Sequence, residues 1–244
     1  MKYIVSMSGG KDSTACLLYA LNNLNRDDVI PVFIDTKWEH ELTYEYLDYL
    51  EHKLNISIIR LESEGMLSLC IRKKFMPNRI MRFCTEELKI KPFNKWLYEN
   101  FVSKNIDFIV IQGIRRDESK SRENTLTFVE KKQTYNGRSF IVKVLYPIAY
   151  WSEKEVFEYI AKNGIEVNPL YKRGFKRVGC YPCVFDNKYE LMLLADDNKY
   201  LQRLRNLENE ISKILNKKVT FFPPGRNKFL RSKSLFASPD YQGD

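Results

Sequence analysis

The stretch Ser8-Gly9-Gly10-Lys11-Asp12-Ser13 limits the fold more than any other part of the chain. The apolar run Tyr3-Ile4-Val5 precedes it, and a helical pattern follows. Adjacent glycines let the backbone turn tightly against an anion, and the helix adds the positive end of its dipole. Ser8 and Ser13 supply hydroxyl donors, and Lys11 supplies a positive charge. The stretch therefore predicts a strand, a phosphate-binding loop and a helix in succession.

An ordinary glycine turn between a strand and a helix is the alternative interpretation, but such a turn needs neither the lysine nor the serines. The order of residues also differs from the Walker pattern, in which a four-residue spacer and a glycine precede the lysine. By itself the loop indicates a nucleotide or pyrophosphate ligand and leaves the reaction open.

Short β-rich runs recur along the chain with helical segments between them. This alternation predicts an α/β fold, a doubly wound parallel five-stranded sheet flanked by helices. Leu42 to Leu54 has the apolar spacing of a crossover helix, Pro92 suits the first turn of another, and Ser152 with Glu155 forms a capping box. The expected strands are Tyr3–Val5, Val29–Ile34, Ile56–Leu61, Phe108–Ile111 and Phe140–Leu145.

The pattern changes toward the C-terminus, so we expect a nucleotide-binding domain over residues 1–170 and an extension over 171–244. Within the extension, Tyr200, Leu204, Leu207, Ile211 and Ile214 follow the spacing of an amphipathic helix that packs on the body or on a partner. Phe221 to Gly225 then interrupts regular structure. From residue 216 onward basic residues predominate: Lys217, Lys218, Arg226, Lys228, Arg231 and Lys233.

Composition narrows the class of protein. The 244 residues carry a formal net charge of +9, which favours a polyanionic partner but also suits any phosphate-binding protein. No apolar run approaches the roughly 18 residues that span a bilayer, and the first residues lack a signal peptide pattern. We therefore expect a cytoplasmic protein without a membrane partner, whose five cysteines are free, metal-bound or catalytic rather than disulfide-bonded.

Two further segments lie where strands of the predicted sheet end. Asp35 closes the second strand at the edge where ligands of doubly wound sheets bind, although a turn carboxylate is an equal alternative. After the fourth strand, Gly113 permits close approach, and the guanidinium groups of Arg115 and Arg116 suit phosphate or sulfate. A solvated basic loop neutralised by Asp117 and Glu118 is the alternative.

The third constellation combines Cys84 with the Cys-x-x-Cys turn of Cys180 and Cys183. Such a turn brings two thiolates together, and a distant third cysteine supplies a third ligand of a [4Fe-4S] cluster with one iron open. Zinc is the less favoured metal because it needs a fourth ligand. A redox disulfide between Cys180 and Cys183 and free thiols without metal also stay open.

In chain order these motifs resemble the phosphoadenosine phosphosulfate (PAPS) reductase family of the PP-loop ATP pyrophosphatase, or adenine nucleotide alpha-hydrolase-like, superfamily. The resemblance covers residues 1 to about 185, and five motifs in the same order are more specific than any one of them. The matching pieces are Ser8–Ser13, Asp35-Thr36, Arg82–Pro92, Gly113–Arg122 and Asn168–Cys183.

The resemblance implies roles for individual residues. Asp35 would lie near adenosine, and Lys11, Asp12 and Arg115 would be catalytic. The residues around phosphate or sulfate would be Ser8, Gly9, Gly10, Lys11, Asp12, Ser13, Lys89, Gly113, Arg115 and Arg116.

Three departures from the family pattern affect the reaction. Phe83 stands before Cys84 where cluster-bearing relatives have an adjacent cysteine pair, and Lys37 stands where relatives often have glycine. Reductases of the family attack the sulfate sulfur with a C-terminal cysteine, and no cysteine follows Cys183 in this sequence.

The leading hypothesis is therefore a PP-loop enzyme that converts ATP, bound with Mg²⁺, to AMP and pyrophosphate. It would adenylate an acceptor for sulfur incorporation into nucleic acid, as the resemblance to the ATP pyrophosphatase component of DNA phosphorothioation systems implies. A sulfonucleotide reductase and a noncatalytic nucleotide- or nucleic-acid-binding subunit are the alternatives. A cysteine desulfurase or other sulfur-transfer partner follows from the resemblance, and a homo-oligomer is open.

Overall fold

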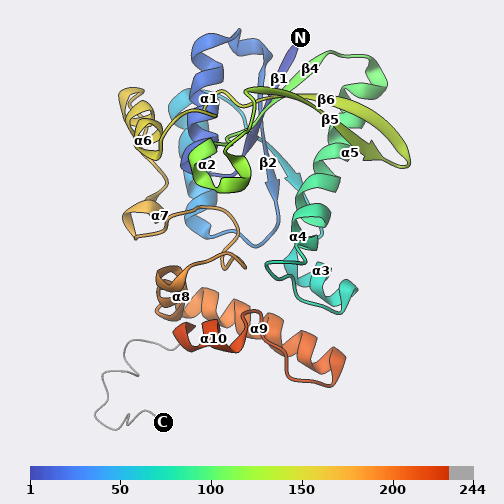
Figure 1. Ribbon diagram of the computed structural model, residues 1–244, viewed down its shortest axis with the longest axis vertical. Helices are drawn as coiled ribbons and strands as arrows, with labels where there is room; N and C mark the ends of the chain where they lie inside the picture. Colours follow the sequence, from blue (N-terminus) through green and yellow to red (C-terminus); the bar gives the residue numbers. More distant parts are fainter. Residues whose placement is uncertain (231–244) are drawn as a thin grey trace.

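A six-stranded sheet forms the centre of the computed structural model, which describes residues 1–230 (Figure 1). The strand order is β3-β2-β1-β4-β6-β5. All neighbouring pairs are parallel except β5 and β6, which form an antiparallel hairpin. The strands are β1 (Lys2–Met7), β2 (Val29–Asp35), β3 (Ile59–Glu62), β4 (Phe108–Ile111), β5 (Phe128–Tyr135) and β6 (Arg138–Leu145).

The α/β class is confirmed, but the prediction of five parallel strands is wrong by one strand. The missed strand is β5, which lies at the sheet edge and alternates exposed with half-buried residues, so its sequence reads as polar. Asn136 and Gly137 join β5 to β6 with φ angles of +47° and +73°. An Asn-Gly pair with positive φ at both residues is the usual turn of a two-residue hairpin, so the signal was present in the sequence.

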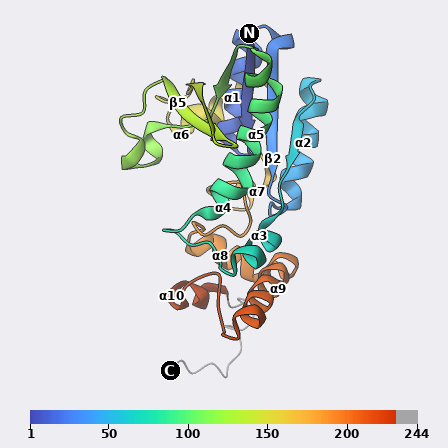
Figure 2. The same ribbon diagram turned by 90° about the vertical axis from the view of Figure 1, so that its right-hand side faces the viewer.

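Helices cover both faces of the sheet (Figures 1 and 2). Helices α1 (Lys11–Asn23), α2 (Glu41–Leu54) and α6 (Glu153–Lys162) pack on one face, and their apolar side chains form one core cluster with β1. Helix α5 (Lys91–Asn100) packs on the other face through Phe93 and Leu97.

Four local predictions of helical structure are confirmed. Helix α2 matches the expected crossover helix, and Pro92 lies in the first turn of α5. Both hydrogen bonds of the Ser152–Glu155 capping box are present at the start of α6. The expected amphipathic helix is α9 (Asn198–Leu215), which buries Tyr200, Leu204, Leu207 and Ile211 but leaves Ile214, at its last turn, exposed.

A third core cluster lies beyond the carboxyl ends of the strands, where α3, α8 and α9 pack together below the sheet in Figure 1. It combines Trp38, Leu69 and Leu88 with Leu204 and Phe222, so early and late parts of the chain share it. The remaining helices are α3 (Met66–Lys73), α4 (Phe83–Thr85), a π-helix (Glu86–Ile90), α7 (Pro169–Lys172), α8 (Lys188–Ala195) and α10 (Pro224–Asn227). Short 3-10 turns are Arg26–Asp28, Val102–Lys104, Arg116–Glu118, Lys120–Arg122 and Lys228–Leu230.

The division at residue 170 stays a prediction, and Arg231 and Lys233 of the basic segment lie outside the described residues. No helix within residues 1–230 combines the length and the apolar character needed to cross a membrane.

Strand order places the candidate site. The chain proceeds from β1 to β2 and β3 on one side, and β4 then pairs on the other side of β1. Ligands of open α/β sheets bind at such a switch point, outside the carboxyl ends of the strands. The loops after β1 and β4 therefore meet there, and a Cβ added at Gly113 would lie 2.7 Å from the backbone carbon of Asp12.

Gly113→Ala is therefore expected to separate the loop after β4 from the loop after β1. The change should lower the free energy of unfolding by about 1–3 kcal/mol, because the added methyl group meets backbone atoms rather than a flexible side chain. Urea unfolding would measure the loss. Gly225→Ala is the matched control, since nothing lies within 4 Å of its added Cβ, and equal effects of the two changes would contradict the close-approach argument.

Candidate nucleotide site

The loop from Ser8 to Ser13 connects β1 to α1, and at the N-terminus of the helix the Lys11 amide donates to the Tyr171 hydroxyl at 2.9 Å. Gly9 has a φ of +73°, and Gly10 caps α1 without a side-chain hydrogen bond. The Ser8 and Ser13 hydroxyl oxygens lie 3.2 Å apart, and Ser13 Oγ donates to the Gly10 carbonyl at 2.9 Å. These contacts fix the loop from within, so the positive end of the helix dipole faces the sheet edge.

Lys11 and Asp12, at the start of α1, form a chain of buried charges. Lys11 is only 4% exposed, and its Nζ lies 3.1 Å from Asp12 Oδ2 and 3.2 Å from Glu153 Oε1. The second carboxylate oxygen of Asp12 lies 2.6 Å from Arg115 Nε. Asp12 therefore holds both cations beside the phosphate loop.

A cavity lies between the loops after β1 and β4, and we call it the phosphate cavity. Arg115 and Arg116 do not line it. Besides Asp12, the buried Arg115 side chain pairs with Asp117, and the neighbouring carboxylates raise its pKa against the lowering effect of burial. Arg116 donates to the Thr125 carbonyl, and its guanidinium carbon lies 4.0 Å above the ring of Tyr150. Their assignment as phosphate ligands stays a prediction from the resemblance.

Two other arginines line the cavity: Arg122, from the basic run after β4, and Arg177, which sequence reasoning missed, from the segment before the Cys-x-x-Cys turn. Both pair with Glu118, which binds Arg122 through one oxygen and lies 3.3 Å from Arg177 Nη2 through the other. The sequence carried a signal only for Arg122, as part of a basic run, because 59 residues separate Glu118 from Arg177.

The phosphate cavity has a volume of about 280 Å³. Loop amides, hydroxyl groups and three cations surround it, a combination suited to a polyphosphate. Its lining comprises Ser6, Ser8, Gly10, Lys11, Asp12, Ser13, Gln112, Gly113, Ile114, Glu118, Arg122, Tyr171, Arg177 and Val178.

A second cavity, of about 160 Å³, lies beside the phosphate cavity at the ends of β1 and β2. Two aromatic rings and two isoleucines give it an apolar wall, which suits a nucleobase. It shares Ser6, Ser8 and Gln112 with the phosphate cavity, so the two are adjacent. The other lining residues are Met7, Phe33, Ile34, Glu39, Lys89, Ile90, Phe93 and Gly179.

Glu39, rather than Asp35, is the carboxylate that lines this second cavity. Asp35 Oδ1 accepts from the Lys37 amide and from the Tyr44 hydroxyl, each at 2.7 Å, so it acts as the turn carboxylate weighed as the alternative. Glu39 is 3% exposed and accepts from the Thr36 hydroxyl at 2.6 Å. The assignment of Asp35 to the adenosine stays a prediction.

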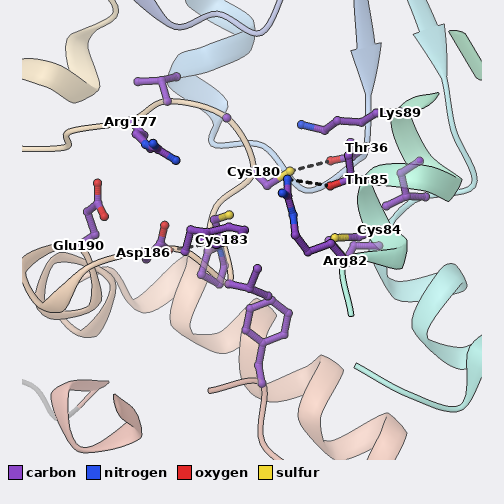
Figure 3. Close-up of a pocket in the computed structure, with 18 residues that line it drawn as sticks. Thr36, Arg82, Cys84, Thr85, Lys89, Arg177, Cys180, Cys183, Asp186 and Glu190 are labelled. Atoms are coloured by element: carbon purple, nitrogen blue, oxygen red, sulfur yellow. Dashed lines mark hydrogen bonds between the residues drawn. The ribbon is translucent and has the colours of Figure 1, made fainter. Parts of the chain in front are cut away.

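The three predicted metal-binding cysteines line one further cavity of about 200 Å³ (Figure 3). Cys84 approaches from α4, and Cys180 and Cys183 approach from the opposite loop. Three cations also line the cavity: Arg82, Lys89 and Arg177.

The three thiols lie in one cavity but are not grouped as metal ligands in the part of the chain that the structure describes. No group of three or more His, Cys, Asp or Glu residues within residues 1–230 is arranged to hold a metal ion. The Cys180 Sγ instead lies 3.8 Å from Thr36 Oγ1 and 3.9 Å from Glu39 Oε1. Burial raises the pKa of Cys84 and raises that of Cys183 to about 12, which favours neutral thiols.

Lys89 lies where the cysteine cavity and the second cavity meet, since it lines both. It projects from the π-helix that connects α4 to α5. The Cys180 sulfur, and then the carboxylate of Glu39, raise the pKa of Lys89, so the side chain keeps its positive charge. Of the predicted anion ligands, Lys89 is therefore the one that lies between the second cavity and the cysteine cavity.

The fold and these cavities define a nucleotide-binding protein of the adenine nucleotide alpha-hydrolase-like class. A model of the phosphoadenosine phosphosulfate reductase domain matches residues 2–185, and the chain belongs to this family of enzymes.

Relatives extend the comparison. An uncharacterized protein of Methanocaldococcus jannaschii is 34% identical over 182 residues, which cover 74% of this chain and 35% of the relative. An uncharacterized protein of Escherichia phage 186 is 31% identical over 236 residues, covering 77% and 68%. The adenosine 5'-phosphosulfate reductase of Staphylococcus haemolyticus is 31% identical over 197 residues, covering 76% and 72%. The chain thus spans about a third of the archaeal relative.

Solved structures share the fold at low sequence identity. The PAPS reductase of Candida auris, in a phosphate complex, aligns with a TM-score of 0.55 at 15% identity over 75% of this chain and 83% of that chain. The FMN adenylyltransferase of Candida glabrata, with FMN and an ATP analog, aligns with a TM-score of 0.50 at 19% identity, over 74% and 55%. At these identities the likeness concerns the fold alone.

The ion-pair cluster around Glu87 fixes the π-helix and therefore Lys89. Glu87 Oε1 lies 2.9 Å from Lys73 Nζ and 3.0 Å from Lys91 Nζ, which ties α3 to the π-helix and to α5. The hydrogen bond from Lys73 lowers the pKa of Glu87 to about 2. The depressed pKa means that the stabilisation is present above about pH 4.5 and is lost as the pH falls toward 2.

Glu87→Gln is therefore expected to lower the free energy of unfolding by about 1–2 kcal/mol at pH 7, and the difference from wild type should shrink between pH 4.5 and 2. Chemical unfolding at several pH values measures it. Glu86→Gln is the control, because Glu86 is exposed and forms no ion pair with a described residue. A pH-independent loss in Glu87→Gln would contradict the ion-pair explanation.

Proposed function

We propose that the chain binds Mg-ATP and adenylates an acceptor oxygen with release of pyrophosphate, in support of sulfur incorporation into a nucleic acid. The observation that carries this proposal is the meeting of the three cavities. The cysteine cavity shares Arg177 and Val178 with the phosphate cavity, and Lys89 and Gly179 with the apolar cavity. A molecule that fills the phosphate cavity and the apolar cavity would therefore expose its central part toward the cysteine cavity.

ATP fits this arrangement. Its adenine suits the apolar wall formed by Phe33 and Phe93, and its β- and γ-phosphates suit the cavity at the N-terminus of α1. The α-phosphate would then lie near Ser8 and Gln112, which line both cavities. Mg²⁺ enters with the triphosphate as part of the substrate.

The chain's residues then favour one reaction. An acceptor oxygen attacks the α-phosphorus, the bond between this phosphorus and the α,β-bridging oxygen breaks, and pyrophosphate leaves with the negative charge. Lys11 and Arg122, which line the phosphate cavity, would stabilise that charge together with the dipole of α1. Lys89 would neutralise charge at the α-phosphate from the side of the cysteine cavity.

The nature of the acceptor follows from charge. The cysteine cavity presents Arg82, Lys89 and Arg177, so an anionic acceptor such as a nucleic acid is favoured. A phosphorothioation-like reaction adds a sulfur donor, supplied by a desulfurase or another transfer partner, which displaces AMP from the adenylated acceptor.

Lys11→Ala is expected to lower pyrophosphate release from Mg-ATP by about 100-fold, because it removes the buried cation of the phosphate loop. A coupled pyrophosphate assay with and without DNA or transfer RNA measures it. Lys104→Ala is the control, since Lys104 is exposed near the amino end of β4. Release that is equal in all three proteins would contradict the proposed role, and stimulation by one nucleic acid would identify the acceptor class.

The reductase alternative is favoured by the three thiols beside the nucleotide cavities and by the staphylococcal relative. It predicts tight binding of adenosine phosphosulfate or its 3'-phosphate and cysteine-dependent release of sulfite. Sulfite without pyrophosphate would select this alternative. Nucleotide binding that survives Lys11→Ala, without turnover in either protein, would select the noncatalytic subunit.

An iron–sulfur cluster on Cys84, Cys180 and Cys183 stays a prediction from the resemblance, and no step above passes through it. Iron and zinc analysis of anaerobically purified protein tests it. The cluster predicts iron in wild type that is lost in Cys180→Ser and retained in Cys16→Ser, because Cys16 lies in the core of α1. Absence of both metals would leave the pocket as a free-thiol site.

A further inference from the structure

A groove of about 490 Å³ lies outside the three cavities, between the loop after α3 and the segment after α9. Its floor is apolar and its rim carries the cations Arg79, Lys217 and Arg226, whereas no Asp or Glu is among the described residues that line it. The remaining lining residues are Phe75, Met76, Pro77, Asn78, Ile80, Val184, Ile211, Leu215, Val219, Thr220, Phe221, Phe222 and Pro223.

Two guanidinium groups converge in this groove without a neutralising ion pair. Arg79 Nε and Arg226 Nη1 donate to the same Val184 carbonyl, at 3.1 Å and 2.8 Å. Burial, followed by repulsion from Arg79, lowers the pKa of Arg226, although Asp186 and Glu190 oppose this effect. Neither arginine forms an ion pair within 4 Å with a described residue, and the buried Arg226 Nη2 has no hydrogen-bond partner among them. Such a pair of like charges favours an anion that bridges both.

Exposed apolar side chains lie beside these cations. Ile80 is 93% exposed, Met81 50% and Phe75 41%. The Phe185 ring is also exposed, with the guanidinium carbons of Arg79 and Arg82 at 5.8 Å and 4.9 Å from its centre. Cations interleaved with exposed apolar and aromatic side chains are typical of surfaces on which the bases of single-stranded nucleic acids stack.

The groove leads to the cysteine cavity. The two share Val184 and Phe221, and Arg82 lines the cysteine cavity directly after the loop that forms one wall of the groove. Figure 3 shows Arg82 beside Cys84, on the side of the cavity opposite Arg177. A strand lying in the groove would therefore continue toward Lys89 and the nucleotide.

We propose that this groove binds a single-stranded nucleic acid, with Arg79 and Arg226 on its phosphodiester backbone, Phe75 and Ile80 against its bases, and Phe185 against a base at the neighbouring cysteine cavity. A single strand fits better than a duplex because the apolar side chains need unpaired bases as partners. The inference rests on the proposed function for the role of the strand as acceptor, but the binding itself requires no turnover.

Fluorescence anisotropy of a labelled 12-nucleotide single-stranded DNA, with the full chain and without ATP, tests the proposal. Arg79→Gln with Arg226→Gln should weaken binding at least tenfold. The double change should also reduce the slope of log affinity against log salt by about 1.4, since each neutralised phosphate of a single strand contributes ~0.7. Phe75→Ala should weaken binding about tenfold with the slope unchanged, since it removes only stacking. Arg138→Gln, on the remote hairpin, is the control for charge.

Melting temperatures of all variants separate binding from folding, and the same variants should release pyrophosphate from Mg-ATP at the wild-type rate without nucleic acid. Wild-type affinity in the double variant would overturn the groove as the binding site while leaving the proposed function intact. If the double variant loses strand binding but the wild-type protein never releases pyrophosphate, the groove is supported and the proposed function is overturned. Equal affinity for duplex DNA, full displacement by poly-glutamate, or self-association that depends on Phe75 would each overturn the single-strand assignment.

Discussion

The arrangement of the site depends on how Arg203 of α9 holds two distant loops together. Its guanidinium donates to the carbonyls of Trp38 and Glu39, both at 3.1 Å, and to that of Tyr181. The Tyr181 amide in turn donates to the Trp38 carbonyl at 2.7 Å, and the Trp38 ring lies 4.3 Å below the guanidinium carbon. A guanidinium on three carbonyls satisfies groups that would otherwise be costly to bury. The segment before Cys183 therefore lies against the end of β2, where it forms a wall of all three cavities.

The same contact explains how a carboxylate can lie buried beside the nucleotide cavities. Glu39 pairs with Cys180 in an isolated β-bridge, so the Arg203 hydrogen bonds that hold the two loops together also fix the backbone of Glu39. Its oxygens accept from the amides of Thr36 and Trp38, and its charge raises the pKa of Lys89. Buried charges are tolerated when hydrogen bonds and an opposite charge compensate their desolvation. Glu39 and Lys89 therefore support each other across the junction.

Local sequence patterns predicted the parts of this structure that depend on local physics. The phosphate loop, the capping box at Ser152 and the stripe of α9 all follow from short-range rules. Lys37 adopts a φ of +54°, a left-handed conformation that glycine tolerates best, which accounts for the glycine expected there from the resemblance. The resemblance thus indicated a backbone conformation that favours glycine, and in this chain Lys37 adopts that conformation.

Long-range pairing accounts for what the sequence did not indicate. Nothing local distinguishes Arg177, which meets Glu118, from Arg115, which Asp12 and Asp117 bind away from the cavity. All of these arginines pair with carboxylates, and they differ in whether they line the cavity. The sequence could indicate the candidate cations, but only the fold shows which of them line the cavity.

Electrostatics at the junction are compatible with the anionic acceptor of the proposed function, whereas a metal ion would have to overcome two local costs. Burial raises the pKa of Asp186 well above its usual range, and the Glu190 carboxylate accepts from the amides of Lys176 and Asn187. Burial likewise favours the neutral form of Cys84 and Cys183, so these two thiols contribute little negative charge at neutral pH. A cation entering here would first have to remove their protons and overcome Lys89. The phosphate-bearing strand of the proposal would meet no such cost, because Arg82, Lys89 and Arg177 already line this cavity.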